Sequence, residues 1–593
     1  MLRTHTAGEL TAKNIGDTVT LSGWVANRRD HGGLIFIDLR DRYGLTQTVF
    51  DPSEDKEAWE VADTFRSEYV VQLTGKVRSR PEGQENKDLI TGEIEVIISN
   101  AKILSKSEVP PFEVSEHSDA NEDIRLKYRY LDLRRKNTFD TIAFRSKMNA
   151  FTRDWFIEND FLEVQTPLFT VSSPEGARDY LIPSRIHHGK FYALPQAPQQ
   201  YKQLLMVGGV DKYFQIAPCF RDEDPRADRH SCEFYQIDAE MSFVDQDDVF
   251  EVAEKFSKDL IENLSDKKIV HLDGDKFKRL TYKEAMDLYG SDKPDIRFDM
   301  HFEDFTDTFK DSGFSLFANT VAQGGVVKAM KLEGVEISRK QIDELTEVAR
   351  SLGAGGLAYI IYDKEGPRSP ILKFFNETEL NDLMQKLAPK EGDVIFFGAG
   401  DYKTTCKVLG GVRVECRDKF DLVDSNEIGF CWVTDFPMYE LKDDGTYDFE
   451  HNPFSMPHGG ASAFEGDIDP LEIHGAQYDL ACNGYEVLSG SIRNHDINAL
   501  VKAFEIVGKG EEEVKEKFGA MYTAFKYGVP PHGGFAFGFD RLMMILKDET
   551  NIREIYAFPK SGKAEDVMMN APASVDEMQL RELHIKVRET NNK

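Results

Sequence analysis

The hydrophobic and polar positions of the first hundred residues alternate in five short runs. These runs are residues 18–27, 34–40, 45–50, 69–77 and 92–104. Alternation predicts half-buried strands, because successive side chains of a strand point to opposite faces of the sheet. A helical pattern at residues 54–67 lies between the third and fourth runs. Five strands with a helix after the third is the order of an OB-fold, a small barrel that often binds single-stranded nucleic acid.

The second of these runs carries an aromatic side chain on its polar face. In Leu34–Arg40 the apolar residues at 35, 37 and 39 form the core face, so Phe36 points the other way. An aromatic on that face is a candidate platform for base stacking, which contributes about 1–3 kcal/mol per base. Four arginines of this region could contact phosphates: Arg28, Arg29, Arg78 and Arg80. The alternative is one exposed phenylalanine among ordinary surface arginines.

Residues 109–136 have the composition of a linker. They begin Val109-Pro110-Pro111 and end in the segment RLKYRYLDLRRK at residues 125–136. This segment is the clearest positive patch of an acidic chain, and it could follow a nucleic-acid backbone. A solvated helix face is the alternative explanation of the same residues.

The stretch from Tyr213 to Phe243 is strand-like at both ends and highly charged in between. Its bend holds arginines and carboxylates in the run RDEDPRADR, residues 221–229. Guanidinium groups match phosphate oxygens in pairs, and carboxylates hold Mg²⁺ while several waters stay on the ion. The bend therefore predicts a site for a polyphosphate and its magnesium, with a solvated charged hairpin as the alternative. On the second strand, one polar face that should line a cleft carries Phe234, Gln236, Asp238 and Glu240.

Three further motifs precede this hairpin. The segment FLEVQTPL at residues 161–168 predicts a strand that Pro167 confines to an edge or an interface. Residues 172–179, SSPEGARD, have the composition of a mobile lid or of a plain surface loop. Gln199 and Lys202 lie three residues apart on one face of a predicted helix, where Lys202 is available to a small carboxylate.

Polar motifs return only in the last third of the chain. Residues 292–419 alternate helices with short strands, which predicts an inserted α+β domain without a catalytic constellation. Asp479 and Glu486 then lie seven apart across a predicted hairpin turn at residues 483–484, so that they could face each other and share a metal ion. Arg493 follows in a strand rich in Gly and Ser, where small neighbours leave room for a ligand.

A glycine-rich strand followed by a helix completes the pattern. It reads GGFAFGFDRLMMIL from Gly533 to Leu546, and the helix begins at Asp540 and Arg541. The glycines permit close approach of a ligand to the backbone, although buried packing explains them equally well.

Composition narrows these possibilities. With 593 residues the chain is too long for one core, so three or four domains are expected. A hydrophobic content of 40% without a membrane span or a signal-peptide pattern predicts a globular protein of the cytoplasm. The six cysteines form no CxxC pair, so reduced thiols are expected instead of disulfides or a zinc ribbon. The net charge of −31 argues against nucleic-acid binding overall, yet local basic patches still act, because screening at cellular salt extends over about 8 Å.

Several of these motifs together resemble those of the class II aminoacyl-tRNA synthetases. FRDEDPRADRHSCEFYQ is similar to motif two of that family, GFAFGFDRL to motif three, and FLEVQTPLF to motif one, which lies at its dimer interface. Four other segments are similar to bacterial-type aspartyl-tRNA synthetases: LKYRYLDLRR, PEGARDYLIPSR, LPQAPQQYKQLLM and GSIRNH. The resemblance covers essentially the whole chain and implies an α+β multidomain fold. In that fold an N-terminal OB-fold precedes an antiparallel catalytic sheet flanked by helices, with an inserted α+β domain.

Six segments follow from the resemblance and the patterning together. They are 1–108, an OB-fold anticodon-binding domain; 109–138, a hinge; 139–291, the first catalytic part with motifs one and two; 292–420, the inserted bacterial-type domain; 421–562, the second catalytic part with motif three; and 563–593, a C-terminal extension.

The resemblance implies a two-step reaction in which Mg²⁺-bound ATP and L-aspartate give aspartyl-adenylate, and the aspartyl group then passes to the 3′-end of tRNA. No side-chain nucleophile is required, since alignment and charge stabilisation supply the rate. The residues implied as catalytic are Arg221, Glu223 and Arg541. Those implied for ATP are Arg221, Asp222, Glu223, Phe234, Gln236, Glu486, Gly538, Asp540 and Arg541, with adenine between Phe234 and Arg541. Those implied for aspartate are Glu175, Gln199, Lys202, Arg221, Asp238, His451 and Arg493, and those for Mg²⁺ are Asp479 and Glu486.

The resemblance also implies the RNA partner and the assembly. The implied anticodon contacts are Arg29, His31, Phe36, Gln47, Arg78, Gly83 and Glu95. His31 and Gly83 resemble members that charge both tRNA(Asp) and tRNA(Asn), whereas discriminating members tend to carry a bulkier aliphatic residue and a lysine there. A non-discriminating enzyme is therefore expected, with a discriminating one as the alternative. A homodimer is implied, together with a tRNA-dependent amidotransferase that converts the misacylated product.

Three positions depart from the family pattern, and three other functions compete. Asn452 replaces a second histidine near the aspartate pocket, Ala197 replaces a serine, and Val49 replaces a stacking aromatic. The competing functions are a tRNA-independent amino-acid ligase, an inactive nucleic-acid-binding protein, and an asparaginyl- or lysyl-tRNA synthetase. The OB-fold argues against the first and the retained ATP residues against the second. The inserted domain and the set of Gln199, Lys202 and Arg493 argue against the third.

Overall fold

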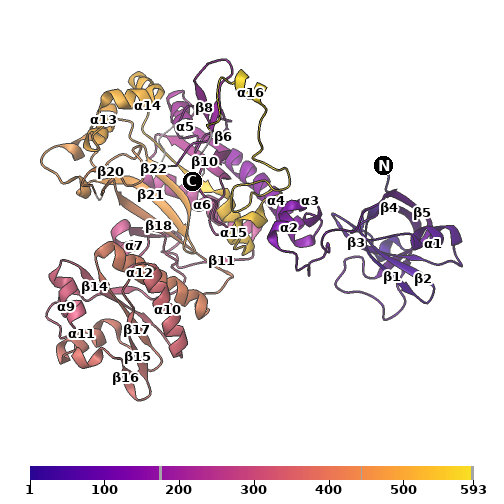
Figure 1. Cartoon of the computed structure of the whole chain (residues 1–593), viewed down its shortest axis with the longest axis horizontal. Helices are drawn as coiled ribbons and strands as arrows, with labels where there is room; N and C mark the ends of the chain where they lie inside the picture. The colour runs from indigo at the N-terminus through magenta and orange to yellow at the C-terminus, as the bar shows by residue number, and fades with distance from the viewer. Residues whose placement is uncertain (173–176, 443, 589–593) are drawn as a thin grey trace. The chain divides into compact units, whose positions relative to one another are not determined.

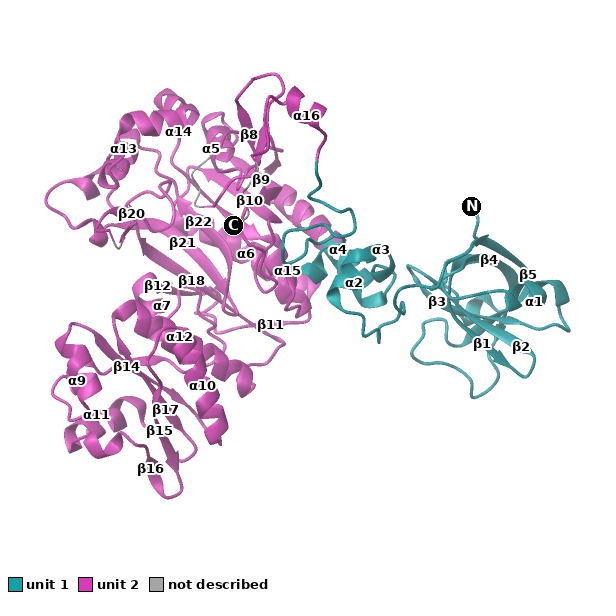
Figure 2. Ribbon diagram, in the orientation of Figure 1, with its two compact units in different colours: residues 1–145, 553–574 teal, residues 146–552, 575–593 magenta. Residues whose placement is uncertain are grey.

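The chain forms two compact units in a computed structural model that describes residues 1–172, 177–442 and 444–588. The first unit comprises residues 1–145 and 553–574, and the second comprises residues 146–552 and 575–593 (Figure 2). Each unit has its own hydrophobic core.

The first unit begins with a closed five-stranded barrel (Figure 1), whose strands pair in the order β1-β2-β3-β5-β4. The elements are β1 (Thr18–His31), β2 (Leu34–Asp41), β3 (Gly44–Phe50), α1 (Lys56–Asp63), β4 (Val70–Ser79) and β5 (Ile94–Ser105). The OB-fold that the sequence predicts is confirmed, with its helix between the third and fourth strands.

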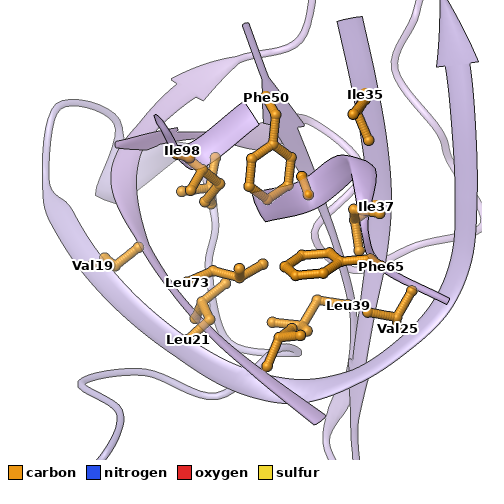
Figure 3. Packing of buried hydrophobic residues seen from close by; sticks show 14 of the residues in the cluster. Val19, Leu21, Val25, Ile35, Ile37, Leu39, Phe50, Phe65, Leu73 and Ile98 are labelled. Carbon is orange, nitrogen blue, oxygen red and sulfur yellow. The ribbon is translucent and has the colours of Figure 1, made fainter. Parts of the chain in front are cut away.

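The barrel closes around the apolar face that the alternation predicts. Ile35, Ile37 and Leu39 are fully buried, and they belong to one cluster with Phe50 and Phe65 (Figure 3). The rings of Phe50 and Phe65 meet edge to face with centroids 6.0 Å apart, an arrangement that aromatic pairs prefer. The core therefore fills the barrel and leaves the polar face of β2 outside it.

The basic segment at residues 125–136 is not an open surface patch. It contains the short helices α2 (Glu122–Lys127) and α3 (Arg129–Asp132). Arg129 is 2% exposed, and it donates to the Asp132 carboxylate and to the backbone oxygens of residues 556–557. Each of the other three arginines also has an ion pair: Arg125–Glu554 at 2.5 Å, Arg134–Glu68 at 2.8 Å and Arg135–Asp132 at 2.9 Å. The solvated helix face is therefore wrong for these arginines, because each is held by a partner within the same unit, and the contact with a nucleic-acid backbone stays a prediction.

The second unit is built on a nine-stranded sheet. Its strands follow the order β11-β18-β21-β22-β23-β10-β9-β6, and β12 also pairs with β18. The strands are β6 (Leu162–Glu163), β9 (Lys212–Phe220), β10 (Glu233–Ser242), β11 (Lys268–Val270), β12 (Lys278–Thr281), β18 (Glu427–Pro437), β21 (His474–Cys482), β22 (Tyr485–Ile492) and β23 (His532–Gly538). The pairs β6–β9, β11–β18 and β12–β18 are parallel, and the central strands are antiparallel, as expected for a class II catalytic sheet.

Helices and two small hairpins accompany this sheet. They are α4 (Lys136–Glu158), β7 (Leu181–Pro183), β8 (Phe191–Ala193), α5 (Gln199–Val207), α6 (Gln246–Leu264), α7 (Tyr282–Tyr289), β19 (Tyr439–Leu441), β20 (Tyr447–Phe449), α13 (Ile497–Ile506), α14 (Glu511–Ala524), α15 (Phe539–Lys547) and α16 (Glu577–Glu582). Phe156 of α4 stacks on Phe214 of β9 with centroids 4.8 Å apart, and Phe256 of α6 lies 5.3 Å from Phe537 of β23. None of the helices in the described part of the chain is long and apolar enough to cross a membrane.

The region predicted as an inserted domain forms a second sheet with helices on both faces. Its strands are ordered β13-β14-β17-β15-β16. The elements are β13 (Phe302–Asp304), α8 (Thr306–Phe309), α9 (Ser315–Ala322), β14 (Val326–Leu332), α10 (Arg339–Ser351), β15 (Ala358–Asp363), β16 (Gly366–Arg368), α11 (Glu377–Leu387), β17 (Val394–Gly400) and α12 (Tyr402–Lys419). Alternate residues of β17 enter two separate clusters: Phe396 packs with α10 and α12, and Phe397 packs with α8, α9 and α11.

Candidate active site

The predicted hairpin of residues 213–243 is present and lies within the nine-stranded sheet. Its strands β9 and β10 are antiparallel, and β10 also pairs with the glycine-rich strand β23. Asp238 and Glu240 on the polar face of β10 are fully buried. Gly534 lies opposite Glu240, and a Cβ there would come within 2.2 Å of a Glu240 carboxylate oxygen. The glycines of β23 therefore leave space for the buried carboxylates of β10.

A buried network of two cations and two carboxylates occupies this face. Lys202 of α5 donates to Asp238 at 2.6 Å and lies 3.3 Å from Glu240. Arg493, which follows β22, binds the Glu240 carboxylate with Nε at 2.8 Å and Nη2 at 3.0 Å. Its third hydrogen bond runs from Nη1 to the Ser491 hydroxyl at 3.0 Å. The two cations that the sequence predicts for a substrate carboxylate are thus held in place by carboxylates of the protein.

The pairing with Glu240 fixes which edge of the Arg493 guanidinium faces a ligand. A guanidinium has five N–H groups, of which the three bonds above use one on each nitrogen. Among the described residues, this leaves one N–H on each terminal nitrogen, the pair that suits a bidentate carboxylate. The sequence placed Glu240 on the polar face but did not predict this orienting role, for which the alternation along β10 is the only local signal.

The charges of the two carboxylates respond differently to burial. Burial alone raises the pKa of Glu240, but Arg493 and Lys202 outweigh it and lower the pKa to about 2. Burial raises the pKa of Asp238, and Lys202 offsets the shift only in part. Glu240 is therefore the carboxylate that stays ionised beside Arg493 at neutral pH.

Arg221 and Phe234, both predicted for the nucleotide, lie beside the loop that joins the two strands of the same hairpin. The Arg221 guanidinium carbon lies 5.1 Å from the centre of the Phe234 ring, a cation–π distance. Arg541, in the first turn of α15, donates through Nη1 to the backbone oxygen of Glu486. The Arg221 side chain thus lies over Phe234, and the position of adenine between Phe234 and Arg541 stays a prediction.

Three other predicted nucleotide residues have defined surroundings. Asp540 is buried, and its carboxylate accepts the Tyr235 backbone N–H at 2.8 Å, which ties α15 to β10. Gln236 lies opposite Gly538 in the β10–β23 pair and accepts from the Cys219 thiol at 3.3 Å. Asp540 therefore has a positioning contact in addition to its predicted contact with ATP.

Asp479 and Glu486 share one face of the β21–β22 hairpin, but they are not directly opposite each other. Glu486 pairs with Ala481, and a register shift follows between residues 480 and 481, so Asp479 is its diagonal neighbour. Burial first, and then the negative charge of Glu486, raise the pKa of Asp479 well above its ordinary value. Asp292 adds negative charge near Asp479, and the sequence did not predict this contribution. Within the described residues, no third metal-binding side chain completes a cluster with this pair.

Buried polar atoms without a hydrogen-bond partner collect at these predicted residues. Thirteen such side-chain atoms occur in the described part of the chain. Five belong to residues predicted for the catalytic site, namely Gln199 Nε2, Arg221 Nε, Asp238 Oδ2, Asp479 Oδ1 and Arg541 Nε. Because buried polar groups are nearly always paired, this concentration indicates a site shaped for a polar ligand.

Two predicted aspartate residues remain, His451 and Glu175. The His451 ring meets the Phe436 ring edge to face at 5.1 Å, and its side chain is accessible to solvent. Surrounding protein atoms still lower its pKa, which the negative charges of Asp292 and Glu486 oppose. Glu175, predicted for the substrate ammonium group, lies outside the described residues.

Five of the predicted anticodon residues form one connected patch on the barrel. Arg29 binds Asp38 at 2.8 Å and lies beside Phe36 in the β1–β2 pair. Gln47 donates to Glu95 at 2.9 Å, and Arg78 pairs with the same carboxylate at 2.9 Å. The patch consists of Arg29, Phe36, Gln47, Arg78 and Glu95. His31 ends β1, and Gly83 lies in the β4–β5 connection with a φ of +79°.

Comparison with known protein families accounts for both the barrel and the catalytic sheet. Residues 121–562 match the family described as "tRNA synthetases class II (D, K and N)". Residues 19–104 match the "OB-fold nucleic acid binding domain". The chain belongs to the class II tRNA synthetases. The resemblance seen in the sequence motifs and the predicted fold class are thereby confirmed.

Curated relatives of this class II synthetase are similar over nearly the whole chain. An "Aspartate--tRNA(Asp/Asn) ligase" of Chlorobium phaeobacteroides (strain BS1) is 50% identical over 587 residues, which cover 99% of this chain and 96% of the relative. One of Gluconobacter oxydans (strain 621H), with the same name, is 50% identical over 585 residues, which cover 98% of this chain and 97% of the relative.

Solved structures support the class II fold. The asparaginyl-tRNA synthetase from Pyrococcus horikoshii, complexed with asparaginyl-adenylate, superposes with a TM-score of 0.55 at 19% identity, covering 93% of this chain and 97% of that one. The aspartyl-tRNA synthetase from Entamoeba histolytica gives a TM-score of 0.55 at 19% identity, with 93% and 90% covered. At this identity the two structures establish the fold of the class II synthetase, and not its substrate.

Proposed function

We propose that this chain activates L-aspartate with ATP and transfers the aspartyl group to tRNA(Asp) and tRNA(Asn). The observation that carries the proposal is the buried cation pair of Lys202 and Arg493, fixed by Glu240 so that two N–H groups face a ligand. This arrangement fits a small carboxylate. The class II fold and the relatives at 50% identity, which are named for the same reaction, support it.

In the first step, an α-carboxylate oxygen of aspartate attacks the α-phosphorus of ATP. A new P–O bond forms, the bond to the β-phosphate breaks, and pyrophosphate leaves. Negative charge develops on the α-phosphate oxygens, where Arg221 provides a guanidinium that is already positioned against Phe234. Arg541, in the first turn of α15, binds the pyrophosphate end, and the dipole of the helix favours that charge.

In the second step, the 3′-hydroxyl of the terminal tRNA adenosine attacks the carbonyl carbon of the adenylate. The bond between that carbon and the phosphate oxygen breaks, the hydroxyl proton passes to the departing phosphate, and AMP leaves. The mixed anhydride is already activated, so a protein nucleophile is not required. The task of the site is to hold the two reacting groups in line.

We propose that Asp479 and Glu486 hold a magnesium ion. Asp479 Oδ1 is buried and has no hydrogen-bond partner. Burial and the nearby charge of Glu486 raise the pKa of Asp479, and a divalent cation bound between the two carboxylates would relieve their repulsion. When bound, the ion neutralises phosphate charge and orients the polyphosphate.

The same network explains a preference for aspartate over asparagine. The asparagine amide would bring N–H donors towards Arg493 and Lys202, which are themselves donors. A buried N–H donor of Arg493 or Lys202 would then have no acceptor, which strongly weakens binding of asparagine. This chemistry disfavours an asparaginyl-tRNA synthetase as the alternative function.

We expect aspartate charging of transcripts with anticodons GUC and GUU at comparable kcat/KM. The double variant His31→Leu, Gly83→Lys should lower charging of the GUU transcript about 10-fold or more, the usual scale for one base mismatch, and change GUC charging little. The measurement is aminoacylation of both purified transcripts with labelled aspartate.

Gly83→Ala is the matched control, because it introduces the same strain at φ +79° without the lysine. If the wild-type chain charges the GUU transcript thousands of times more slowly than the GUC transcript, the proposal that it charges both tRNA(Asp) and tRNA(Asn) is wrong. Charging of neither transcript, with pyrophosphate exchange intact, would favour the tRNA-independent ligase. Charging of both transcripts implies a partner, an amidotransferase that converts aspartyl-tRNA(Asn) to asparaginyl-tRNA(Asn). We propose that both enzymes act in the cytoplasm.

We also propose that the chain is a homodimer through motif one. Large apolar side chains are exposed in and after this motif: Leu162, Leu168, Phe169 and Val171. Phe169 lies beside the exposed Tyr192 of β8, with ring centroids 5.5 Å apart, so the apolar surface extends beyond one segment.

Light scattering should give twice the chain mass of 67.5 kDa for the wild-type chain. Phe169→Asp should shift the chain to a monomer at micromolar concentration, because it places a charge in an apolar interface. Leu316→Asp, at an exposed position in the inserted domain, should leave the dimer intact. A monomeric wild-type chain would refute the proposal.

A further inference from the structure

The segment that leads into the inserted domain contains a fully buried carboxylate. Asp295 accepts hydrogen bonds from Arg297 Nε at 3.0 Å and Nη2 at 2.8 Å, and from Arg417 Nη1 of α12 at 3.1 Å. Burial alone raises its pKa, but the two arginines outweigh burial and lower the pKa of Asp295 below its ordinary value. A charged group therefore links the segment that leads into the domain with the helix that leads out of it.

A second arginine of α12, Arg413, donates hydrogen bonds to backbone oxygens of the same segment. Arg413 is 2% exposed and donates from Nη2 to the backbone oxygens of Asp295, Phe298 and Asp299 at 3.0, 2.7 and 2.9 Å. Its Nε donates to the Met300 oxygen at 3.2 Å. Because one buried guanidinium satisfies four carbonyl groups, the two connecting segments are held as one joint.

This joint lies against the turn between β21 and β22. Gly484 in that turn has a φ of +86°, and a Cβ added there would lie 3.5 Å from both Arg417 Nη1 and Asp295 Cβ. The neighbouring Asn483 side chain accepts the Gly429 N–H of β18 at 2.8 Å. The turn is therefore held between the joint on one side and the catalytic sheet on the other.

The same turn connects the two carboxylates of the proposed magnesium site. Asp479 lies in β21 before the turn, and Glu486 lies in β22 after it. Glu486 is only two residues from Gly484 and the register shift lies between it and the partner of Asp479, so a displacement of the turn should move Glu486 relative to Asp479. Magnesium demands near-ideal octahedral geometry, so its affinity is sensitive to such a displacement.

We propose that the joint of Asp295, Arg413 and Arg417 positions the β21–β22 hairpin, so that the inserted domain sets the affinity of the adenylation site for magnesium. The inference rests on the proposed aspartate activation and adds a role for the inserted domain. Asp295 and Arg417 are positioning residues, since they act through the turn and not on the reactants.

The test compares Asp295→Asn and Arg417→Gln with the wild-type full-length chain. Binding of Mn²⁺ in the presence of α,β-methylene-ATP, followed by electron paramagnetic resonance, should weaken about 10-fold in both variants, as for residues that orient metal ligands. The Mg²⁺ concentration for half-maximal aspartate-dependent pyrophosphate exchange should rise by the same factor, with the rate recovered at saturating Mg²⁺. Arg350→Gln is the control, because it breaks an exposed ion pair of 2.6 Å with Glu347 in the same inserted domain.

Wild-type Mn²⁺ affinity in the two folded variants would overturn the inference. Loss of the Asp295 charge takes the carboxylate from Arg297, whereas Arg417 keeps its pair with Asp418, so that variant can fail to fold. Arg417→Gln then decides, because its side chain is 15% exposed and its removal leaves Asp295 paired with Arg297. A wild-type chain that binds Mn²⁺ with the nucleotide but forms no aspartyl-adenylate would contradict the proposed function and leave the affinity comparison valid.

Discussion

Arg221→Lys is expected to slow aspartate-dependent pyrophosphate exchange about 100- to 1,000-fold, the usual effect of removing one group that stabilises a transition-state charge. Lysine keeps the positive charge but loses the planar fork and the contact with the Phe234 ring, where the guanidinium carbon lies 5.1 Å from the ring centre. The loss should fall mainly on kcat, because the charge on the α-phosphate develops in the transition state.

Arg581→Lys in α16 provides the control, since it changes an arginine that is 78% exposed and should leave the exchange rate unchanged. Melting curves of both variants establish that the fold is retained. An Arg221→Lys protein with a wild-type kcat would show that another group stabilises the α-phosphate, and it would remove Arg221 from the proposed mechanism.

Arg493→Lys is expected to lower kcat/KM for aspartate about 1,000-fold, which corresponds to about 4 kcal/mol. A lysine at this position cannot bind Glu240 and a substrate carboxylate at the same time, as the guanidinium can with its separate edges. The variant keeps the net charge of the buried network, so the fold is not left with an unpaired Glu240. The KM for ATP should change little, because the nucleotide residues lie at the other end of the hairpin.

The measurement is pyrophosphate exchange over a series of aspartate concentrations, with a matched series for ATP. Lys515→Arg is the control, since it alters an exposed basic residue paired with Glu512 at 2.8 Å in α14. Equal losses for aspartate and ATP would point to a general distortion of the sheet. An unchanged KM for aspartate would show that the substrate carboxylate lies elsewhere.

Much of the fold could be predicted because its strands and helices are local patterns. The alternation at residues 34–40 gave the core face of β2, and the polar face of β10 followed from the same period of two. The pairing of β10 with β23 was not predictable in the same way. It depends on contacts such as Glu240 with Gly534, which are almost 300 residues apart in the chain.

In the candidate site, the residue types could be predicted from the sequence, but the contacts between distant residues could not. Arg221, Lys202 and Asp479 were found from residue type and motif, because phosphate and magnesium demand particular side chains. The orienting role of Glu240 was missed, since a carboxylate on a polar face gives no sign of its partner. The relation of Asp479 to Glu486 was predicted as face to face and is diagonal, because a register shift in one strand leaves no mark in the sequence. The ion pairs of the basic segment could not be predicted for a similar reason, since Glu554 lies far along the chain from Arg125.

The buried arginine of the hinge also sets an order of events during biosynthesis. The barrel closes its core with residues 10–105, so it has all of these core residues early in translation. Arg129 donates to the backbone oxygens of Tyr556 and Ala557, which the ribosome adds more than 400 residues later, so these hydrogen bonds form only near the end of translation. Until then the Arg129 guanidinium, which is 2% exposed in the finished fold, lacks these two backbone acceptors, so residues near the C-terminus complete a contact of the first quarter of the chain. A nascent chain released before residue 556 would therefore carry a finished barrel and an unfinished hinge.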